Sequence, residues 1–164
     1  MGVEIERKFL VKDDTWKAHS IHQEEIAQGY LANTDKCSVR IRLSGESAFL
    51  NIKSMTLGVW RQEYDYDIPT EDARSLLKSL CQKPVIEKTR YHVPWKGHVW
   101  EIDVFHGANQ GLVLAEVELQ AEDEAFALPP WIGKEVTHLE RYYNVTLVQH
   151  SFDQWNPSEQ AGEG

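Results

Sequence analysis

Charged residues at alternate positions of apolar stretches are the feature of this sequence that could do chemistry. In the stretch VEIERKFLV, which begins at Val3, the charged residues Glu4, Glu6 and Lys8 lie two positions apart. Because side chains at positions i and i+2 of a β-strand share a face, this strand would carry two carboxylates and an ammonium side by side. Carboxylates bind hard cations such as Mg²⁺, and an ammonium binds anions. The stretch therefore indicates either a wet sheet surface or a lined cavity that holds metal ions and a polyanion.

The same alternation recurs in VRIRL, FLNIKSM, WRQEYDYDI, IEKTRYH, WEIDVF and LAEVEL. Like charges two positions apart form four doublets: Glu4/Glu6, Arg40/Arg42, Lys88/Arg90 and Glu116/Glu118. Two like charges about 7 Å apart repel by roughly 1 kcal/mol at an effective dielectric near 40. An exposed sheet face has no reason to repeat this arrangement four times, whereas a site for cations and an anion does.

The ordinary explanation of such alternation is a half-buried antiparallel sheet whose charges lie in water, and for any single strand it is the better one. The opposite faces weigh against it here. Apolar residues such as Ile41, Ile52 and Val117 could pack outward beneath helices. This arrangement would leave the charged faces inside a barrel.

Period-two patterns predict eight strands, at 3–12, 24–33, 37–43, 47–55, 60–68, 85–95, 98–106 and 112–120. Helices are expected at 13–19, 70–81 and 138–148, the last two with apolar stripes suited to covering a sheet. We therefore predict an α+β fold: an eight-stranded, closed antiparallel β-barrel, or tunnel, with a charged interior and a few flanking helices. Residues 1–150 would form one domain, and residues 151–164, which are polar and small, a flexible tail.

Composition narrows the class of protein. The chain has 164 residues, 26 acids and 17 bases, for a formal net charge of −9, which argues against a nucleic-acid partner but not against a small anionic ligand. The absence of a long apolar run argues against a membrane partner. Cys37 and Cys81 have no second pair for a zinc site and fit a reducing compartment, so a cytoplasmic protein is expected. The oligomeric state stays open, a homodimer included.

Several segments, in order, resemble one family: EIERKFLV, RIR, NIK, KTRY, WEIDVF, GLVLAEVEL and GKEVTHLERYYN. They are similar to the CYTH proteins, also called triphosphate tunnel metalloenzymes, over about residues 3–148. The resemblance implies an eight-stranded tunnel with charged side chains inside, in which triphosphates are hydrolysed with divalent cations. A minority of the family are adenylate cyclases, and the small bacterial members that look like this chain are inorganic triphosphatases.

The resemblance also implies roles for individual residues. The metal-binding acids would be Glu4, Glu6, Glu63, Asp103, Glu116 and Glu118, holding Mg²⁺ or Mn²⁺, with two ions expected. The triphosphate contacts would be Lys8, Arg40, Arg42, Lys53, Lys88 and Arg90. Tyr30, Lys8 and Lys53 are the catalytic candidates, although Tyr30 could equally be a core aromatic. Glu101 is expected at the edge of the site and Arg61 at its mouth.

Three functions remain open from the sequence. The first is a metal-dependent inorganic triphosphatase, in which water attacks the terminal phosphorus and releases pyrophosphate and phosphate. The second is a relative that converts organic triphosphates: a nucleoside or thiamine triphosphatase, or an adenylate cyclase. The third is a non-catalytic polyphosphate-binding barrel, for which the full set of acids would be superfluous. The seven histidines lack a spacing such as His-x-x-x-His and are expected to be surface or packing residues.

Overall fold

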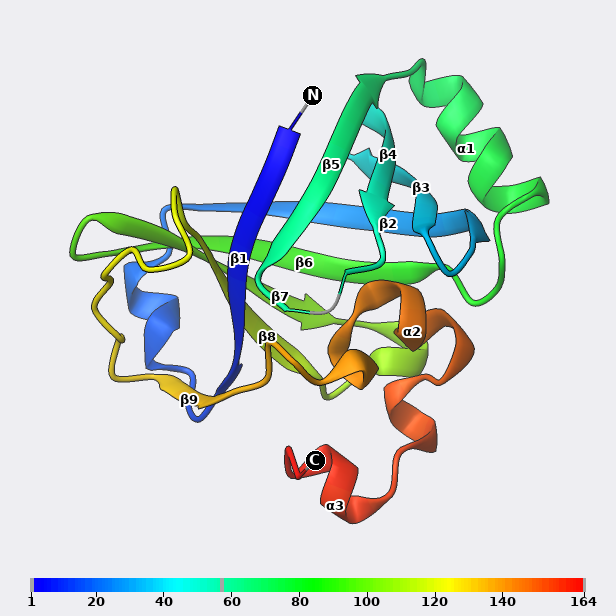
Figure 1. The fold of residues 1–164 in the computed structure, drawn as a ribbon. Helices are drawn as coiled ribbons and strands as arrows, with labels where there is room; N and C mark the ends of the chain where they lie inside the picture. The colour runs from blue at the N-terminus through cyan, green and yellow to red at the C-terminus, as the bar shows by residue number, and fades with distance from the viewer. Residues whose placement is uncertain (1, 57, 164) are drawn as a thin grey trace.

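Eight antiparallel strands close into a barrel in the computed structural model, which describes residues 2–56 and 58–163 (Figure 1). The barrel strands are β1 (Gly2–Val11), β2 (His22–Asn33), β3 (Cys37–Ser44), β4 (Ser47–Ser54), β5 (Trp60–Asp67), β6 (Ile86–Trp95), β7 (His98–Phe105) and β8 (Val113–Glu118). The predicted eight-stranded closed barrel is confirmed.

Strand β1 closes the barrel because it pairs on both sides. Glu4 lies opposite Arg61 of β5, and Lys8 lies opposite Glu116 of β8. A ninth strand, β9 (Ile132–Glu135), pairs with the second half of β1. Strand β9 was not predicted, because it has only four residues, one of them a glycine, and so shows no clear period-two pattern.

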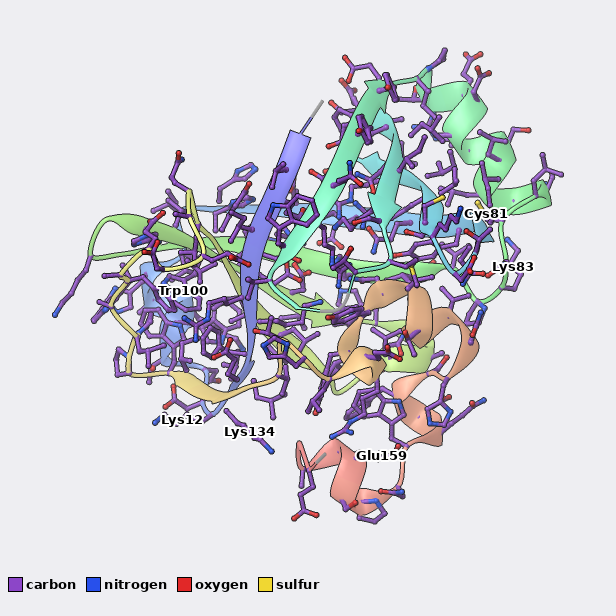
Figure 2. All side chains as sticks on the ribbon, viewed as in Figure 1. Lys12, Cys81, Lys83, Trp100, Lys134 and Glu159 are labelled. Atoms are coloured by element: carbon purple, nitrogen blue, oxygen red, sulfur yellow. The ribbon has the colours of Figure 1, made fainter. Side chains whose placement is uncertain are left out.

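The outward faces of β2, β3 and β4 are apolar and are covered by helix α1 (Thr70–Ser79). Ala73 and Leu77 of this helix pack against Ile41, which is fully buried. The helix end comes so near β2 that a Cβ on Gly29 would lie 2.8 Å from the Cβ of Cys81, which Figure 2 labels beside α1. A side chain at position 29 would therefore push the helix off the sheet.

A second apolar cluster covers the outward faces of β1, β6, β7 and β8. Trp16 from the 3₁₀-helix η1 (Thr15–His19), Trp100 from β7 and Trp131 before β9 are each at most 2% exposed. Figure 2 labels Trp100. Apolar side chains therefore pack outside the barrel, as the strand faces predict. The predicted helix at 13–19 is present as this shorter 3₁₀-helix.

The segment predicted as a helix at 138–148 is not continuous. It forms a 3₁₀-helix, η3 (Glu140–Tyr142), followed by α2 (Asn144–Gln149), because Tyr143 has extended backbone angles, φ −74° and ψ 136°. It also does not cover the outside of the sheet. Its apolar residues pack with the inward-facing Ile86, Phe105 and Leu114, so the segment closes one end of the barrel interior. We call residues 140–149 the plug.

The chain after the plug contains two further short elements, η4 (Phe152–Gln154) and α3 (Pro157–Gln160), drawn in red in Figure 1. Helix α3 begins with a capping box in which Asn156 and Glu159 satisfy each other's backbone N–H groups. The Tyr142 hydroxyl donates to the Glu159 carbonyl at 3.3 Å. These contacts join the segment to the plug, and the flexibility of 151–164 stays a prediction.

The remaining short element is η2 (Gly107–Asn109), between β7 and β8. Cys37 and Cys81 are free thiols, as expected. Within residues 2–56 and 58–163, no helix is both long and apolar enough to cross a bilayer.

Candidate active site

The barrel encloses a charged cavity of about 200 Å³ that ends at the plug. Its wall carries seven carboxylates, Glu4, Glu6, Glu63, Asp65, Glu101, Glu116 and Glu118, and six cations, Lys8, Arg40, Arg42, Lys53, Arg61 and Arg90. Every residue predicted for the site lines this cavity except Lys88 and Asp103. The inward orientation of the charged faces is therefore confirmed.

Strand register explains how all eight barrel strands contribute to one wall. Residues opposite each other across an antiparallel pair point to the same side. The pairs Glu6 with Glu118, Lys53 with Glu63, and Arg90 with Asp103 all face inward. Charged residues of neighbouring strands thereby share one wall, and some of these cross-strand pairs join like charges while others join opposite charges.

One patch is acidic and contains Glu4, Glu6, Glu63 and Glu118, with Lys53 as its cation. The Lys53 Nζ lies 2.9 Å from Glu4 Oε1 and 3.5 Å from Glu63 Oε2. Burial lowers the pKa of Lys53, but the surrounding Glu4, Glu6 and Glu63 carboxylates outweigh burial and raise it above its ordinary value. Lys53 therefore stays charged.

A single ammonium does not neutralise this acidic patch. Burial, together with the charges of Glu116 and Glu4, raises the pKa of Glu6 well above its ordinary value. Burial and a hydrogen bond with Glu4 raise the pKa of Glu63 to about 7, and burial also raises that of Glu118. The patch thus holds carboxylates that resist ionisation unless further positive charge arrives.

A second patch is basic and contains Arg40, Arg42 and Arg90. Burial and the charges of Arg40 and Arg90 lower the pKa of Arg42 to about 10. Arg42 Nε donates to Gln28 Oε1 at 3.1 Å, whereas the buried Arg40 Nε has no hydrogen-bond partner among the described residues. Crowded guanidinium groups with unused donors favour the binding of an anion.

Lys88 and Asp103 lie behind the basic patch and not on the cavity wall. The Lys88 Nζ is 2.7 Å from Asp103 Oδ2, and Arg90 donates to both Asp103 oxygens, at 2.7 and 2.9 Å. Although burial favours its neutral form, the charges of Arg90 and Lys88 hold the pKa of Asp103 below its ordinary value. Burial lowers the pKa of Lys88 to about 7. Asp103 therefore fixes the Arg90 guanidinium, which reaches the cavity.

The plug contributes three residues to the cavity wall that were not predicted for the site: Tyr143, Asn144 and Val145. The Tyr143 hydroxyl donates to the Thr137 carbonyl at 2.8 Å, and the Arg61 guanidinium carbon lies 4.1 Å from the centre of its ring. Asn144 Oδ1 accepts from Gln28 Nε2 at 2.9 Å and from Lys88 Nζ at 3.3 Å. The segment RYYN, noted in the family resemblance, contains Tyr143 and Asn144. Because a continuous helix covering the sheet was expected there, these residues were predicted to have a packing role.

Two predicted catalytic candidates lie beside the plug. The Lys8 Nζ is 3.6 Å from Glu116 Oε1 and donates to the Tyr142 carbonyl at 3.4 Å. Burial would raise the pKa of Glu116, but the Lys8 charge holds it at about 2. Tyr30 lines the cavity and also belongs to the apolar cluster of the plug, so the structure supports both interpretations of it.

The lumen carboxylates are spread around the wall. No three of them, among the described residues, bring oxygens within 4.8 Å of one another. This donor set nevertheless fits Mg²⁺ or Mn²⁺. Such ions commonly take one or two carboxylates and complete their shell with water and substrate phosphate oxygens. Asp103 differs from the other acids because both of its oxygens already contact cations.

Comparison with known proteins agrees with this arrangement. The CYTH domain family model matches residues 2–152. An inorganic triphosphatase of Acetivibrio thermocellus is 44% identical over 153 residues, which cover 93% of this chain and 97% of that protein. An inorganic triphosphatase of Nitrosomonas europaea is 42% identical, over 88% of this chain and 96% of that protein. The crystal structure of the inorganic triphosphatase NE1496 matches with a TM-score of 0.66 at 39% identity, covering 88% of this chain and 97% of that one.

Proposed function

This chain belongs to the CYTH domain family, and we propose that it hydrolyses inorganic triphosphate to pyrophosphate and phosphate with the help of divalent cations. The observation that carries this proposal is the division of one enclosed wall into an acidic and a basic patch. A polyanion can lie along the guanidinium groups while cations lie between it and the carboxylates. The identity to two inorganic triphosphatases supports the same activity.

The basic patch would bind the substrate. Arg40, Arg42 and Arg90 offer planar donors for phosphate oxygens, and Lys8 and Lys53 add point charges to the cavity wall. Lys88, also predicted as a phosphate contact, lies behind this wall, and its direct contact stays a prediction.

Glu4, Glu6, Glu63, Glu116 and Glu118 would hold the divalent cations, with Mg²⁺ or Mn²⁺ expected and two ions proposed. Bound there, the cations would supply charge neutralisation of the phosphates and lower the pKa of bound water. The metal role of Asp103 stays a prediction, because its ion pairs favour a different one: holding Arg90 in place.

Hydrolysis needs a water molecule in line with the terminal phosphorus and a path for its proton. Tyr30, at the plug, would position that water. Lys8 and Lys53 would stabilise charge on the bridging oxygen as the bond between it and the terminal phosphorus breaks. The water oxygen ends on the released phosphate, and the bridging oxygen leaves with pyrophosphate. The water proton passes to a phosphate oxygen or to solvent.

The cavity wall favours an inorganic substrate over a nucleotide or thiamine triphosphate. Apart from Tyr30, Tyr143 and Val145, the described residues that line it are charged or polar. A base or thiazole ring needs an apolar or aromatic platform. The plug uses the faces of these two tyrosines for packing and for Arg61.

The test is phosphate release from tripolyphosphate, ATP and thiamine triphosphate, each with Mg²⁺, Mn²⁺ or EDTA. We expect tripolyphosphate to be hydrolysed far faster than the others and EDTA to stop the reaction. Glu116→Gln should lose metal-supported turnover, while Glu46→Gln, in an exposed turn, should not. Faster turnover of an organic triphosphate, cyclic AMP from ATP, or tight tripolyphosphate binding without turnover would each overturn the proposal.

A further inference from the structure

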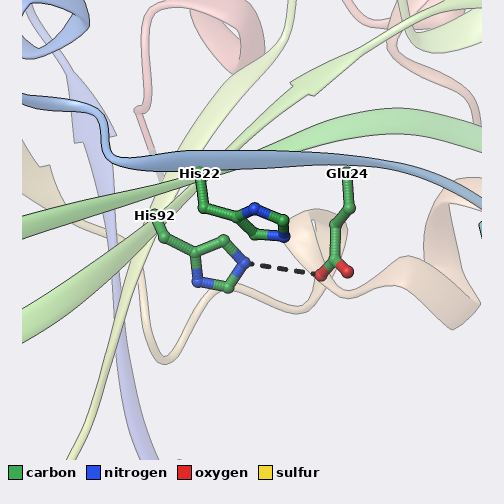
Figure 3. A group of neighbouring side chains, drawn as sticks. All are labelled: His22, Glu24 and His92. Atoms are coloured by element: carbon green, nitrogen blue, oxygen red, sulfur yellow. Dashed lines mark ion pairs between the residues drawn. The ribbon is translucent and has the colours of Figure 1, made fainter.

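We propose that His22, Glu24 and His92 form a second metal site, selective for zinc-class divalent ions, at the rim of the barrel. Figure 3 shows the three side chains projecting to the same side from the neighbouring strands β2 and β6. One potential ligand atom from each lies within 4.8 Å of the other two, and no other group of three His, Cys, Asp or Glu residues in the described ranges does this. This site is independent of the proposed function.

The register between β2 and β6 brings the three side chains together. His22 lies directly opposite His92, and Glu24 follows two residues later on the same face of β2. The two imidazole rings are 5.2 Å apart between centroids. Seventy positions separate these histidines in the sequence, so no local spacing could reveal the pair. All seven histidines were expected to be surface or packing residues. For His22 and His92 we propose metal binding instead.

The distances suit a small ion. His92 Nε2 lies 3.5 Å from Glu24 Oε1. Two ligands of a tetrahedral zinc ion, each about 2.0–2.1 Å from the metal, are about 3.4 Å apart. His22 is exposed and is therefore free to turn its ring toward the shared point.

Two further observations on Glu24 and His92 indicate a ligand. The buried His92 Nε2 has no hydrogen-bond partner among residues 2–56 and 58–163. Ser44 Oγ donates to Glu24 Oε2 at 2.8 Å, which orients the carboxylate so that its other oxygen faces His92. Hydrogen bonds of this kind position metal ligands in known sites. The carboxylate is thus held in place, and the nitrogen that it faces at 3.5 Å makes no hydrogen bond of normal geometry.

The ligand chemistry distinguishes this site from the lumen. Two imidazoles and a carboxylate prefer Zn²⁺ and similar ions. In the lumen the potential metal ligands are carboxylates, which suit Mg²⁺ or Mn²⁺. Three protein ligands leave a fourth position for water or an anion. Glu24 lies opposite Arg90, and His92 lies opposite Glu101, so the bound ion would be next to the edge of the cavity.

The alternative is an ordinary ion pair between a protonated His92 and Glu24. A titration of the metal-free protein with Zn²⁺, in a large excess of Mg²⁺, separates the two. We expect one zinc ion per chain in the wild type, with affinity reduced at least about tenfold in His22→Gln and His92→Gln. Losing an outer hydrogen bond to a ligand already costs that much.

The matched control is His98→Gln. His98 Nε2 lies 2.6 Å from Glu124 Oε2 in a comparable pair that has no third potential ligand among the described residues, so this variant should bind zinc as the wild type does. Co²⁺ should give the wild type, but not His22→Gln, the intense visible absorption of a tetrahedral site. Unchanged zinc affinity in both histidine variants, or only the weak absorption of octahedral Co²⁺, would overturn the proposal. Because His22 is exposed, its variant is expected to fold.

Discussion

Glu63→Gln should stabilise the metal-free protein at alkaline pH, although it removes a negative charge from the cavity. Glu63 lies beside Glu4 and 3.5 Å from Lys53, which also contacts Glu4 at 2.9 Å. Glu4 has the shorter contact and stays ionised, because Lys53 outweighs burial and lowers its pKa. Glu63 is left with a pKa of about 7. Above that pH the patch must accept a second, poorly compensated negative charge.

The sign of the pH dependence follows from this value. Between the unfolded value of 4.5 and about 7, the folded state binds a proton at Glu63 that the unfolded state has lost. The contribution of this proton to stability is fully present below pH 4.5 and is lost as the pH rises through about 7. A glutamine at this position resembles the protonated form at every pH.

The pKa of Glu63 also sets an upper limit on the change in the free energy of unfolding. A pKa rise from 4.5 to about 7 corresponds to about 3.4 kcal/mol. Since Glu63 keeps some contact with solvent, we reduce this to about 1.5–2 kcal/mol. For a domain of this size, about 1 kcal/mol shifts the melting temperature by about 2–4 °C. Glu63→Gln should thus melt about 3–8 °C above the wild type at pH 8 and together with it at pH 4.5.

The assay is thermal and urea unfolding in EDTA across this pH range, with Glu46→Gln, in an exposed turn, as the control. Adding Mg²⁺ should stabilise the wild type by about 2.7 kcal/mol at one hundred times its dissociation constant and Glu63→Gln by less. The reasoning fails if Glu63→Gln is less stable than the wild type at pH 8 in EDTA, or if the difference does not vary with pH.

Two further substitutions separate binding from structural support. Arg42→Ala should raise KM for triphosphate by roughly tenfold to a hundredfold with a smaller change in kcat, since a charge-assisted hydrogen bond contributes about 1.5–3 kcal/mol. An unchanged KM, or an equal change in the exposed control Arg74→Ala, would contradict the assignment. Asp103→Asn should lower the free energy of unfolding by about 3–5 kcal/mol, because it leaves Arg90 buried without its main partner. Glu101→Gln, whose carboxylate is 29% exposed and also contacts Arg90, should cost at most about 1 kcal/mol in the same urea titration, and equal losses would refute the distinction.

The barrel was predictable because strand parity is a local property. In WEIDVF, the alternation of Glu101 and Asp103 with Ile102 and Val104 is visible without any knowledge of partners, and the structure has these residues on opposite faces. The same alternation in the other strands predicted nearly all of the charged residues that line the cavity.

Depth along the barrel, in contrast, could not be predicted. Parity assigns Lys88 and Arg90 to one face, but only the side-chain contacts show that Asp103 holds Lys88 away from the cavity while Arg90 reaches it. The plug was missed for a related reason. An apolar stripe shows that a segment covers something, and the extended backbone of Tyr143, which lets its ring face Arg61, depends on tertiary contacts.

The distribution of apolar residues explains how this barrel tolerates such an interior. Most β-barrels bury their core inside, but here two clusters lie outside, under α1 and around Trp100, and a third lies at the plug. These clusters stabilise the fold, and the cavity wall need not contribute. The lumen can therefore keep Glu6 and Glu63, whose raised pKa values reflect unfavourable ionisation. Sites that bind charged ligands tightly are commonly destabilising when empty. Removing Glu6 or Glu63 should then cost binding and favour stability, the reverse of what removing an outward apolar residue such as Trp100 would do.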